Sequence, residues 1–228
     1  MFLPWNELVS NPQHFVAILI ATAVSLLIAI TVHEFSHALI AYRLGDSTAR
    51  NLGRLSLNPL VHLDPLGTLM LFLAGFGWGK PTPVDPNQLR FPGFKGMALV
   101  SLSGPISNFL TAALFAVPIR LGIVELPSSL TMPSTGGVGE ALGALLTFIV
   151  YFNLVLGVFN LIPIAPLDGF KVVLGIVPRD IAEDFARFEI YGPFVLLAIV
   201  VLDNFFNVGI LSRIIGPPLL YLLRLLLT

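Results

Sequence analysis

The sequence has no cysteine and few charged residues. Of its 228 residues, 11% are charged and 56% are hydrophobic, and the mean hydropathy is +0.90. A soluble globular domain has about 25% charged residues, so this chain has too little charge to cover a surface that faces water. The lack of cysteine excludes disulfides and thiolate metal sites. The composition therefore predicts an integral membrane protein.

Basic residues are scarce as well. The formal net charge of −1 offers no excess of positive charge for nucleic acid, which we exclude as a partner. Residues 1–14 contain no lysine or arginine, unlike the basic start of a signal peptide. The apolar segment that follows has no cleavage site of small residues, and we expect it to be retained.

Five apolar stretches are long enough to cross a bilayer, which predicts an all-α polytopic membrane protein. They are residues 15–42, 97–124, 139–163, 190–206 and 208–227. A sixth stretch, residues 66–79, would extend only about 21 Å as a helix, whereas the hydrocarbon core of a bilayer is about 30 Å thick. We expect it to be re-entrant or to lie against the other helices, with short extended, β-like segments at 53–58 and 80–84.

The charges that flank the sixth stretch predict the topology. Three basic residues precede it and three follow it: Arg43, Arg50, Arg54, Lys80, Arg90 and Lys95. Basic residues collect in cytoplasmic loops, so both flanks are expected inside, with the N-terminus outside and the C-terminus inside. The alternative is that residues 66–79 form a short true span.

The first apolar stretch contains the sequence HEFSH, from His33 to His37. Residues four apart on a helix lie one above the other, about 5–6 Å apart, so the two imidazoles can bind one Zn²⁺. Glu34 remains within reach of a water at the metal and can take its proton. The alternative is a chance match, but an unpartnered glutamate is costly at membrane depth.

A catalytic zinc site needs a third protein ligand. His14 is out of reach, about 28 Å from His33 along a helix, whereas His62 in the following loop stays a candidate. The stronger candidate is Asp168 in FNLIPIAPLDGFKVV, where prolines interrupt an apolar run. Unwound backbone at membrane depth is tolerated only inside protein or along a cavity. Asp168 could instead, or in addition, cap a helix over residues 169–177.

HEFSH on the first helix and NLIPIAPLDG (160–169) on a later, broken helix resemble the motifs of the site-2 proteases, which are intramembrane zinc metalloproteases. Three further segments resemble the family: GRLSLNPLVHLDPLGT, FGWGKPTPV and SGPISNF. The resemblance covers roughly residues 15–178. It implies one membrane-embedded metalloprotease domain over residues 1–228, without a PDZ-like insert, and it assigns no role to the C-terminal helices at 190–227.

The resemblance also implies roles for individual residues. His33, His37 and Asp168 are expected to bind one Zn²⁺ per chain, and Glu34 is expected to activate water. Asn160 matches the family's asparagine ahead of the LDG motif and is expected to hold the substrate backbone or the developing oxyanion.

Asn108 matches a small or polar family position and is the second candidate for substrate binding. The alternative is a helix-packing contact, because Ser103, Ser107 and Thr111 form a stripe of small polar residues on the same helix.

The implied function is regulated intramembrane proteolysis, which is hydrolysis of a peptide bond within or near a transmembrane segment of a membrane protein. The implied partners are that transmembrane substrate and the lipid bilayer of the cytoplasmic membrane, with the active site toward the cytoplasm. A scaffold with structural zinc and a transporter with an ion at its broken helix are the alternatives. A closed structural site with four protein ligands has no use for Glu34, and we find no inverted repeat typical of a transporter.

The topology can be tested with two single cysteines, because the chain has none of its own. Arg50→Cys and Arg90→Cys should both react with a membrane-impermeant thiol reagent from the cytoplasmic side. Reaction from opposite sides would show that residues 66–79 cross the membrane.

Overall fold

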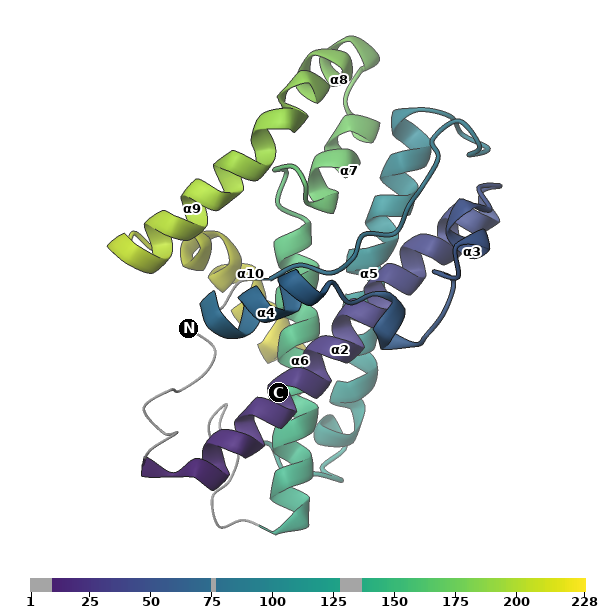
Figure 1. Ribbon diagram of the computed structural model, residues 1–228. Coiled ribbons are helices and arrows are strands. Elements are labelled where there is room, and N and C mark those ends of the chain that lie inside the picture. Colours follow the sequence, from purple (N-terminus) through teal and green to yellow (C-terminus); the bar gives the residue numbers. More distant parts are fainter. Residues whose placement is uncertain (1–9, 75–76, 128–136) are drawn as a thin grey trace.

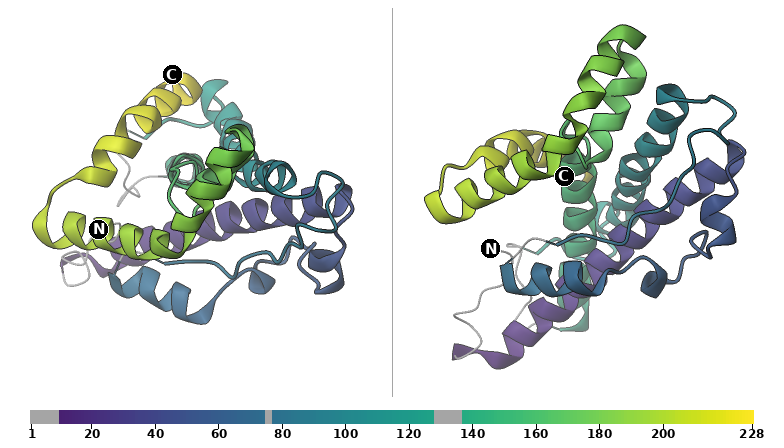
Figure 2. Two further views of the ribbon diagram at one scale, coloured as in Figure 1. Left: turned by 90° about the horizontal axis from the view of Figure 1, so that it is seen from above. Right: turned by 45° about the horizontal axis from the view of Figure 1, so that its top comes forward.

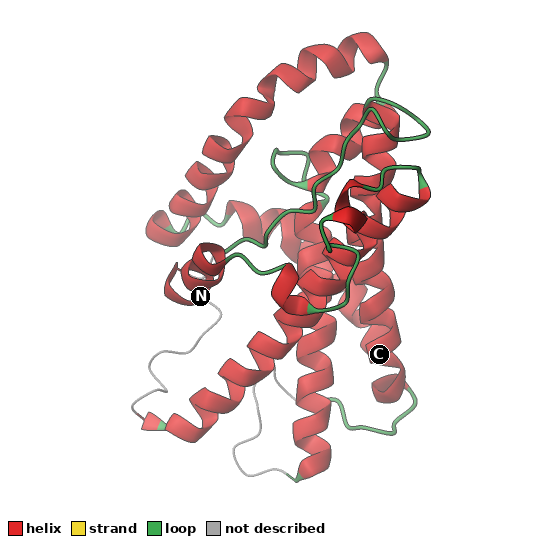
Figure 3. Cartoon of the chain, turned by 45° about the vertical axis from the view of Figure 1, so that its right-hand side comes forward, coloured by secondary structure: helices red, strands yellow, loops and turns green. Residues whose placement is uncertain are grey.

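The computed structural model describes residues 10–74, 77–127 and 137–228, and this part of the chain is helical without a sheet (Figures 1 and 3). The longer helices are α2 (Pro12–Arg43), α5 (Phe94–Arg120), α6 (Val138–Asn160), α9 (Gly192–Phe206) and α10 (Ile210–Leu227). The shorter helices are α3 (Thr48–Asn51), α4 (Pro65–Ala74), α7 (Asp168–Ile176) and α8 (Arg179–Ala186), with 3-10 turns at Pro59–Val61 and Arg187–Tyr191. The prediction of an all-α protein is confirmed.

Five helical segments of the described residues are long and apolar enough to cross a membrane. Four are α2, α5, α6 and α10, and the fifth is the helical run Arg179–Phe206 that joins α8 to α9. The predicted number is therefore confirmed. The fourth predicted segment begins earlier than expected, at Arg179, because the polar helix α8 is joined to α9 through the 3-10 turn Arg187–Tyr191.

Helices α2, α5 and α6 form the centre of the molecule, where α2 crosses the other two obliquely (Figures 1 and 2). Aromatic side chains pack α2 against α6, among them Phe15, Phe148 and Phe152. Helices α5, α6 and α10 share a second cluster around Ala112 and Leu154. Many large apolar side chains of α9 and α10 are exposed, as expected of surfaces that face lipid.

Helix α4 lies in the short sixth stretch, which was expected to be re-entrant or to lie against the other helices. It has 10 residues and therefore extends about 15 Å, and it runs across the direction of α6 in Figures 1 and 2. The extended segments expected at 53–58 and 80–84 form no β-strand in the described residues, where the one bridge near them pairs Leu63 with Gly79. Pro81 and Pro83 have no amide hydrogen to donate to a ladder.

Candidate metal centre

The two histidines of HEFSH lie on the same face of α2, toward the centre of the bundle. Both side chains are buried, and their ring centroids are 4.6 Å apart. This arrangement follows from their spacing of four residues in a regular helix. The sequence therefore places two imidazoles together inside the apolar part of the protein.

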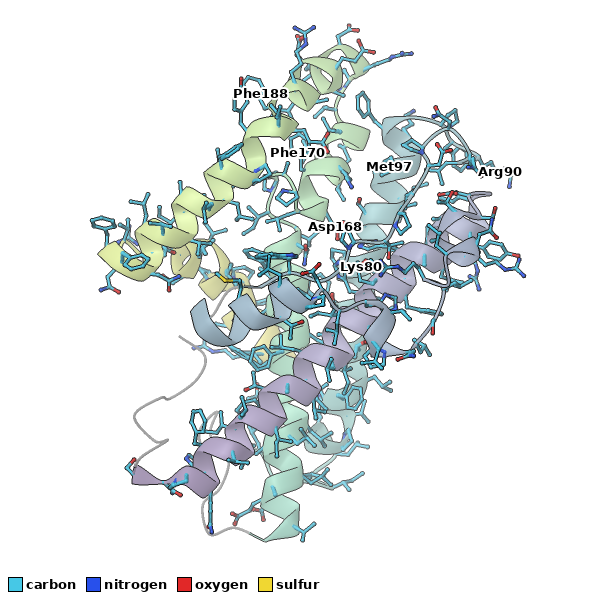
Figure 4. All side chains as sticks on the ribbon, in the orientation of Figure 1. Lys80, Arg90, Met97, Asp168, Phe170 and Phe188 are labelled. Carbon is cyan, nitrogen blue, oxygen red and sulfur yellow. The ribbon has the colours of Figure 1, made fainter. Side chains whose placement is uncertain are left out.

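Asp168 reaches these histidines from a break between two helices. Helix α6 ends at Asn160, residues 161–167 are irregular, and α7 begins at Asp168. The carboxylate oxygen Oδ2 of Asp168 lies 3.0 Å from Nε2 of His33 and 3.1 Å from Nε2 of His37, and Figure 4 shows Asp168 near the start of α7. Asp168 is the first residue of α7, and the N-cap position is occupied by Leu167.

The outer ring nitrogens determine the tautomers of both histidines. Nδ1 of His37 lies 2.8 Å from the carbonyl oxygen of Val100, and Nδ1 of His33 lies 2.7 Å from Oδ1 of Asn108. Both oxygens can only accept a hydrogen bond, so each Nδ1 carries the hydrogen and each Nε2 carries a lone pair. Those lone pairs face the Asp168 carboxylate and repel it unless a cation, or a proton on one ring, lies between them.

The three donor atoms fit a metal ion. They lie within 4.8 Å of one another, and Oδ2 of Asp168 is buried without a hydrogen-bond partner. Ligand bonds of about 2.0–2.1 Å at tetrahedral angles separate the ligand atoms by about 3.3 Å, close to the two nitrogen–oxygen distances. Two imidazoles and one carboxylate form a ligand set that zinc uses in catalytic sites, where the fourth position stays open.

Asn108 supports this centre from α5. Its side chain is 0% exposed, and its amide nitrogen donates to the carbonyl oxygen of Ala29 and to Oδ1 of Asn153, each at 3.0 Å. These two bonds orient the amide so that Oδ1 faces His33. Asn153 was not among the predicted residues, although an asparagine within the apolar run IVYFNLVLG indicates a buried polar partner.

Glu34 lies beside the segment that leads from α4 to α5. Its carboxylate oxygen Oε2 accepts hydrogen bonds from the backbone amide of Thr82 at 2.9 Å and from the Thr82 hydroxyl at 2.7 Å. Thr82 was not among the residues predicted from the sequence. No motif pairs a loop threonine with a helix glutamate 48 positions earlier.

Two further candidates, His62 and Asn160, have backbone partners of their own. The buried side chain of His62 contacts the carbonyl oxygen of Ser56 through Nε2 at 2.7 Å. In the described part of the chain, the group of residues close enough to hold an ion comprises His33, His37 and Asp168, without His62. Asn160 is the last residue of α6, and its amide nitrogen donates to the carbonyl oxygen of Leu156 at 3.0 Å.

Comparison with known proteins identifies the family. Residues 21–202 match the model of peptidase family M50. The chain belongs to peptidase family M50. Members of this family are site-2 proteases, so the resemblance seen in the motifs is confirmed, and the protein is a zinc metalloprotease.

Relatives in bacteria agree with this assignment. The chain is 37% identical over 178 residues to YwhC of Bacillus subtilis, whose name describes a candidate zinc metalloprotease, and the match covers 78% of each chain. It is 32% identical over 166 residues to Rip2 of Mycobacterium tuberculosis, similarly named, across 72% of this chain and 60% of Rip2. The Rip2 protein of Mycolicibacterium smegmatis is 30% identical over 163 residues, which cover 70% of this chain and 58% of Rip2. No solved structure matches significantly.

Gly104 provides a test of the centre's geometry. A Cβ atom on this residue of α5 would lie 2.5 Å from Cε1 of His37 and 2.6 Å from Cε1 of His33. Gly104→Ala should therefore push both imidazoles out of place and weaken zinc binding by about 10- to 100-fold, as loss of supporting contacts does at metal sites.

Gly139→Ala is the matched control, because a Cβ atom there meets nothing within 4 Å. Zinc affinity is measured by competition with a chelator in detergent. Equal affinities of the two variants would contradict the close approach of α5 to the histidines.

Proposed function

We propose that this M50 protease hydrolyses a peptide bond within or near a transmembrane segment of a membrane protein, with Zn²⁺ held by His33, His37 and Asp168. One observation supports the proposal above all. The potential ligand atoms of these three residues lie close together within a bundle of helices that are long and apolar enough to cross a membrane. A helix supplies the two histidines, and a break between helices supplies the aspartate. Polar ligands buried at that depth are costly unless they serve a function.

The metal and the protein contribute different parts of the chemistry. Bound Zn²⁺ supplies a Lewis acid that polarises the peptide carbonyl and lowers the pKa of a water toward about 7. Glu34, next to the ligand His33, takes the proton from the attacking water and returns it to the leaving amine. Asn160, at the end of α6, is assigned to hold the substrate backbone or the developing oxyanion, as the family motif implies.

The residues behind the histidines have a supporting role. Asn108 holds His33, and the Val100 carbonyl holds His37, each through the ring nitrogen that faces away from Asp168. Such partners fix the tautomer and the ring orientation of a ligand. We therefore assign Asn108 to the positioning of His33, since its buried side chain has these protein partners and little access to a substrate.

The proposed location is the cytoplasmic membrane, with the N-terminus outside and the site toward the cytoplasm. His37 lies six residues before the end of α2 at Arg43, about 9 Å along the helix, so water has a short path to the site. Helix α4 is proposed not to cross, because it extends only about 15 Å. The substrate helix has to unwind locally, because its amides are otherwise hydrogen-bonded within the helix.

A non-proteolytic scaffold with structural zinc is the competing function. Structural zinc sites are closed by four protein ligands, whereas the described residues bring together three. Glu34 beside those ligands favours a catalytic centre.

Glu34→Gln decides between these two functions. The substitution keeps the shape of the side chain and a hydrogen bond but removes the ability to accept a proton. Cleavage of a single-span substrate in liposomes should fall by about 10²–10⁴-fold, while the zinc content of the purified variant stays at that of the wild type. Cleavage at the wild-type rate would contradict the protease mechanism and favour the scaffold.

A further inference from the structure

Thr82 makes three contacts with Glu34 across 48 positions of sequence. Besides the two bonds to Oε2, its hydroxyl lies 3.1 Å from the backbone oxygen of Glu34. A hydroxyl has one hydrogen to donate, and the bond to the charged carboxylate is both the shorter and the stronger. Thr82 therefore places its amide and its hydroxyl on the same carboxylate oxygen.

The segment around Thr82 is held in place independently of Glu34. The amide of Lys80 donates to the carbonyl oxygen of His62 at 2.8 Å, and the amide of Asp85 donates to Oδ2 of the buried Asp46 at 2.8 Å. The guanidinium of Arg54 donates to the carbonyl oxygens of Val61 and Lys80. These bonds hold both ends of the segment, at Lys80 and Asp85, against the loops that follow α2.

The sequence of this segment also limits its conformations. Pro81 and Pro83 flank Thr82. Proline fixes its own φ angle, and a residue before proline is confined to extended conformations. The backbone amide of Thr82 is therefore restricted in orientation before any substrate arrives, and the backbone loses little conformational entropy when Thr82 binds the carboxylate.

We propose that Thr82 is a positioning residue for the general base: it occupies Oε2 of Glu34 and leaves Oε1 to accept the proton from water. A free glutamate side chain has three torsions and samples many orientations, whereas catalysis needs the accepting oxygen within hydrogen-bond reach of the water. The inference rests on the proposed role of Glu34. It adds that the loop between α4 and α5 determines which carboxylate oxygen reacts.

The test compares Thr82→Val with Thr82→Ser. Valine keeps the size and the backbone amide but removes the hydroxyl, whereas serine keeps both donors. Thr147→Val is the matched control, because the buried Thr147 hydroxyl donates within α6 to the carbonyl oxygen of Gly143 at 2.8 Å. All variants are assayed for kcat, KM and zinc content with a single-span substrate in liposomes.

Thr82→Val should lower kcat by about tenfold, since a hydrogen bond to a charged group is lost, while KM and zinc content stay unchanged. Thr82→Ser should remain within about twofold of the wild type, and Thr147→Val should match it. Thr82→Ala removes the same hydroxyl without placing a methyl group against the carboxylate, so it should show the same fall in kcat and replaces Thr82→Val if that variant does not fold.

Three outcomes would overturn the proposal. A wild-type kcat in both hydroxyl-free variants would show that the bond does not position the base. A raised KM with an unchanged kcat would make Thr82 a substrate contact. An equal fall in kcat in Thr82→Ser, or a loss of bound zinc, would show that Thr82 has only a structural role. Glu34→Gln in the same assay separates these results from a failure of the proposed function, which is contradicted only if that variant cleaves normally.

Discussion

Two buried imidazoles face one carboxylate, and the rest of the structure depends on this contact. Because both Nδ1 atoms donate to protein oxygens, both Nε2 lone pairs point at Oδ2 of Asp168. Three electron-rich atoms in an apolar bundle repel one another unless a cation, or a proton on one ring, lies between them. Membership of the M50 family makes zinc the metal of this protease, and these three residues form a group that could bind it. Zinc bound at this proposed site would compensate for burying a polar cluster in an apolar bundle.

The fold meets this requirement with few elements. A regular helix brings His33 and His37 to one face, and the break between α6 and α7 brings Asp168 to them at a depth where α5 supplies Asn108 and the carbonyl of Val100. Helix α5 can approach the two histidines closely because Gly104 has no side chain that would displace their imidazole rings. Glu34, the proposed general base, is held by a loop rather than by a helix. The proposed ligands and the proposed base are therefore positioned by separate parts of the chain.

Much of this arrangement could be predicted from the sequence, because the signals were local. Spacing of four residues placed the histidines together, and prolines 163 and 166 indicated where α6 ends. The five membrane segments followed from long apolar runs. Contacts between distant segments could not be predicted in the same way. The bond from Thr82 to Glu34 and the chain from Asn153 through Asn108 to His33 depend on how helices and loops pack. The β-like segments were expected from short extended patterns, but in residues 80–84 Pro81 and Pro83 leave too few amides for a ladder.

In the proposed centre, two histidines and one aspartate bind the zinc, and a fourth position stays open. X-ray absorption at the zinc edge of the purified, metal-loaded protein tests it most directly, because imidazole rings give a characteristic outer-shell scattering that can be counted. We predict nitrogen and oxygen ligands at about 2.0–2.1 Å with the scattering of two imidazoles. A spectrum with three imidazoles would place His62 or His14 at the metal in place of Asp168 and would contradict the centre described above.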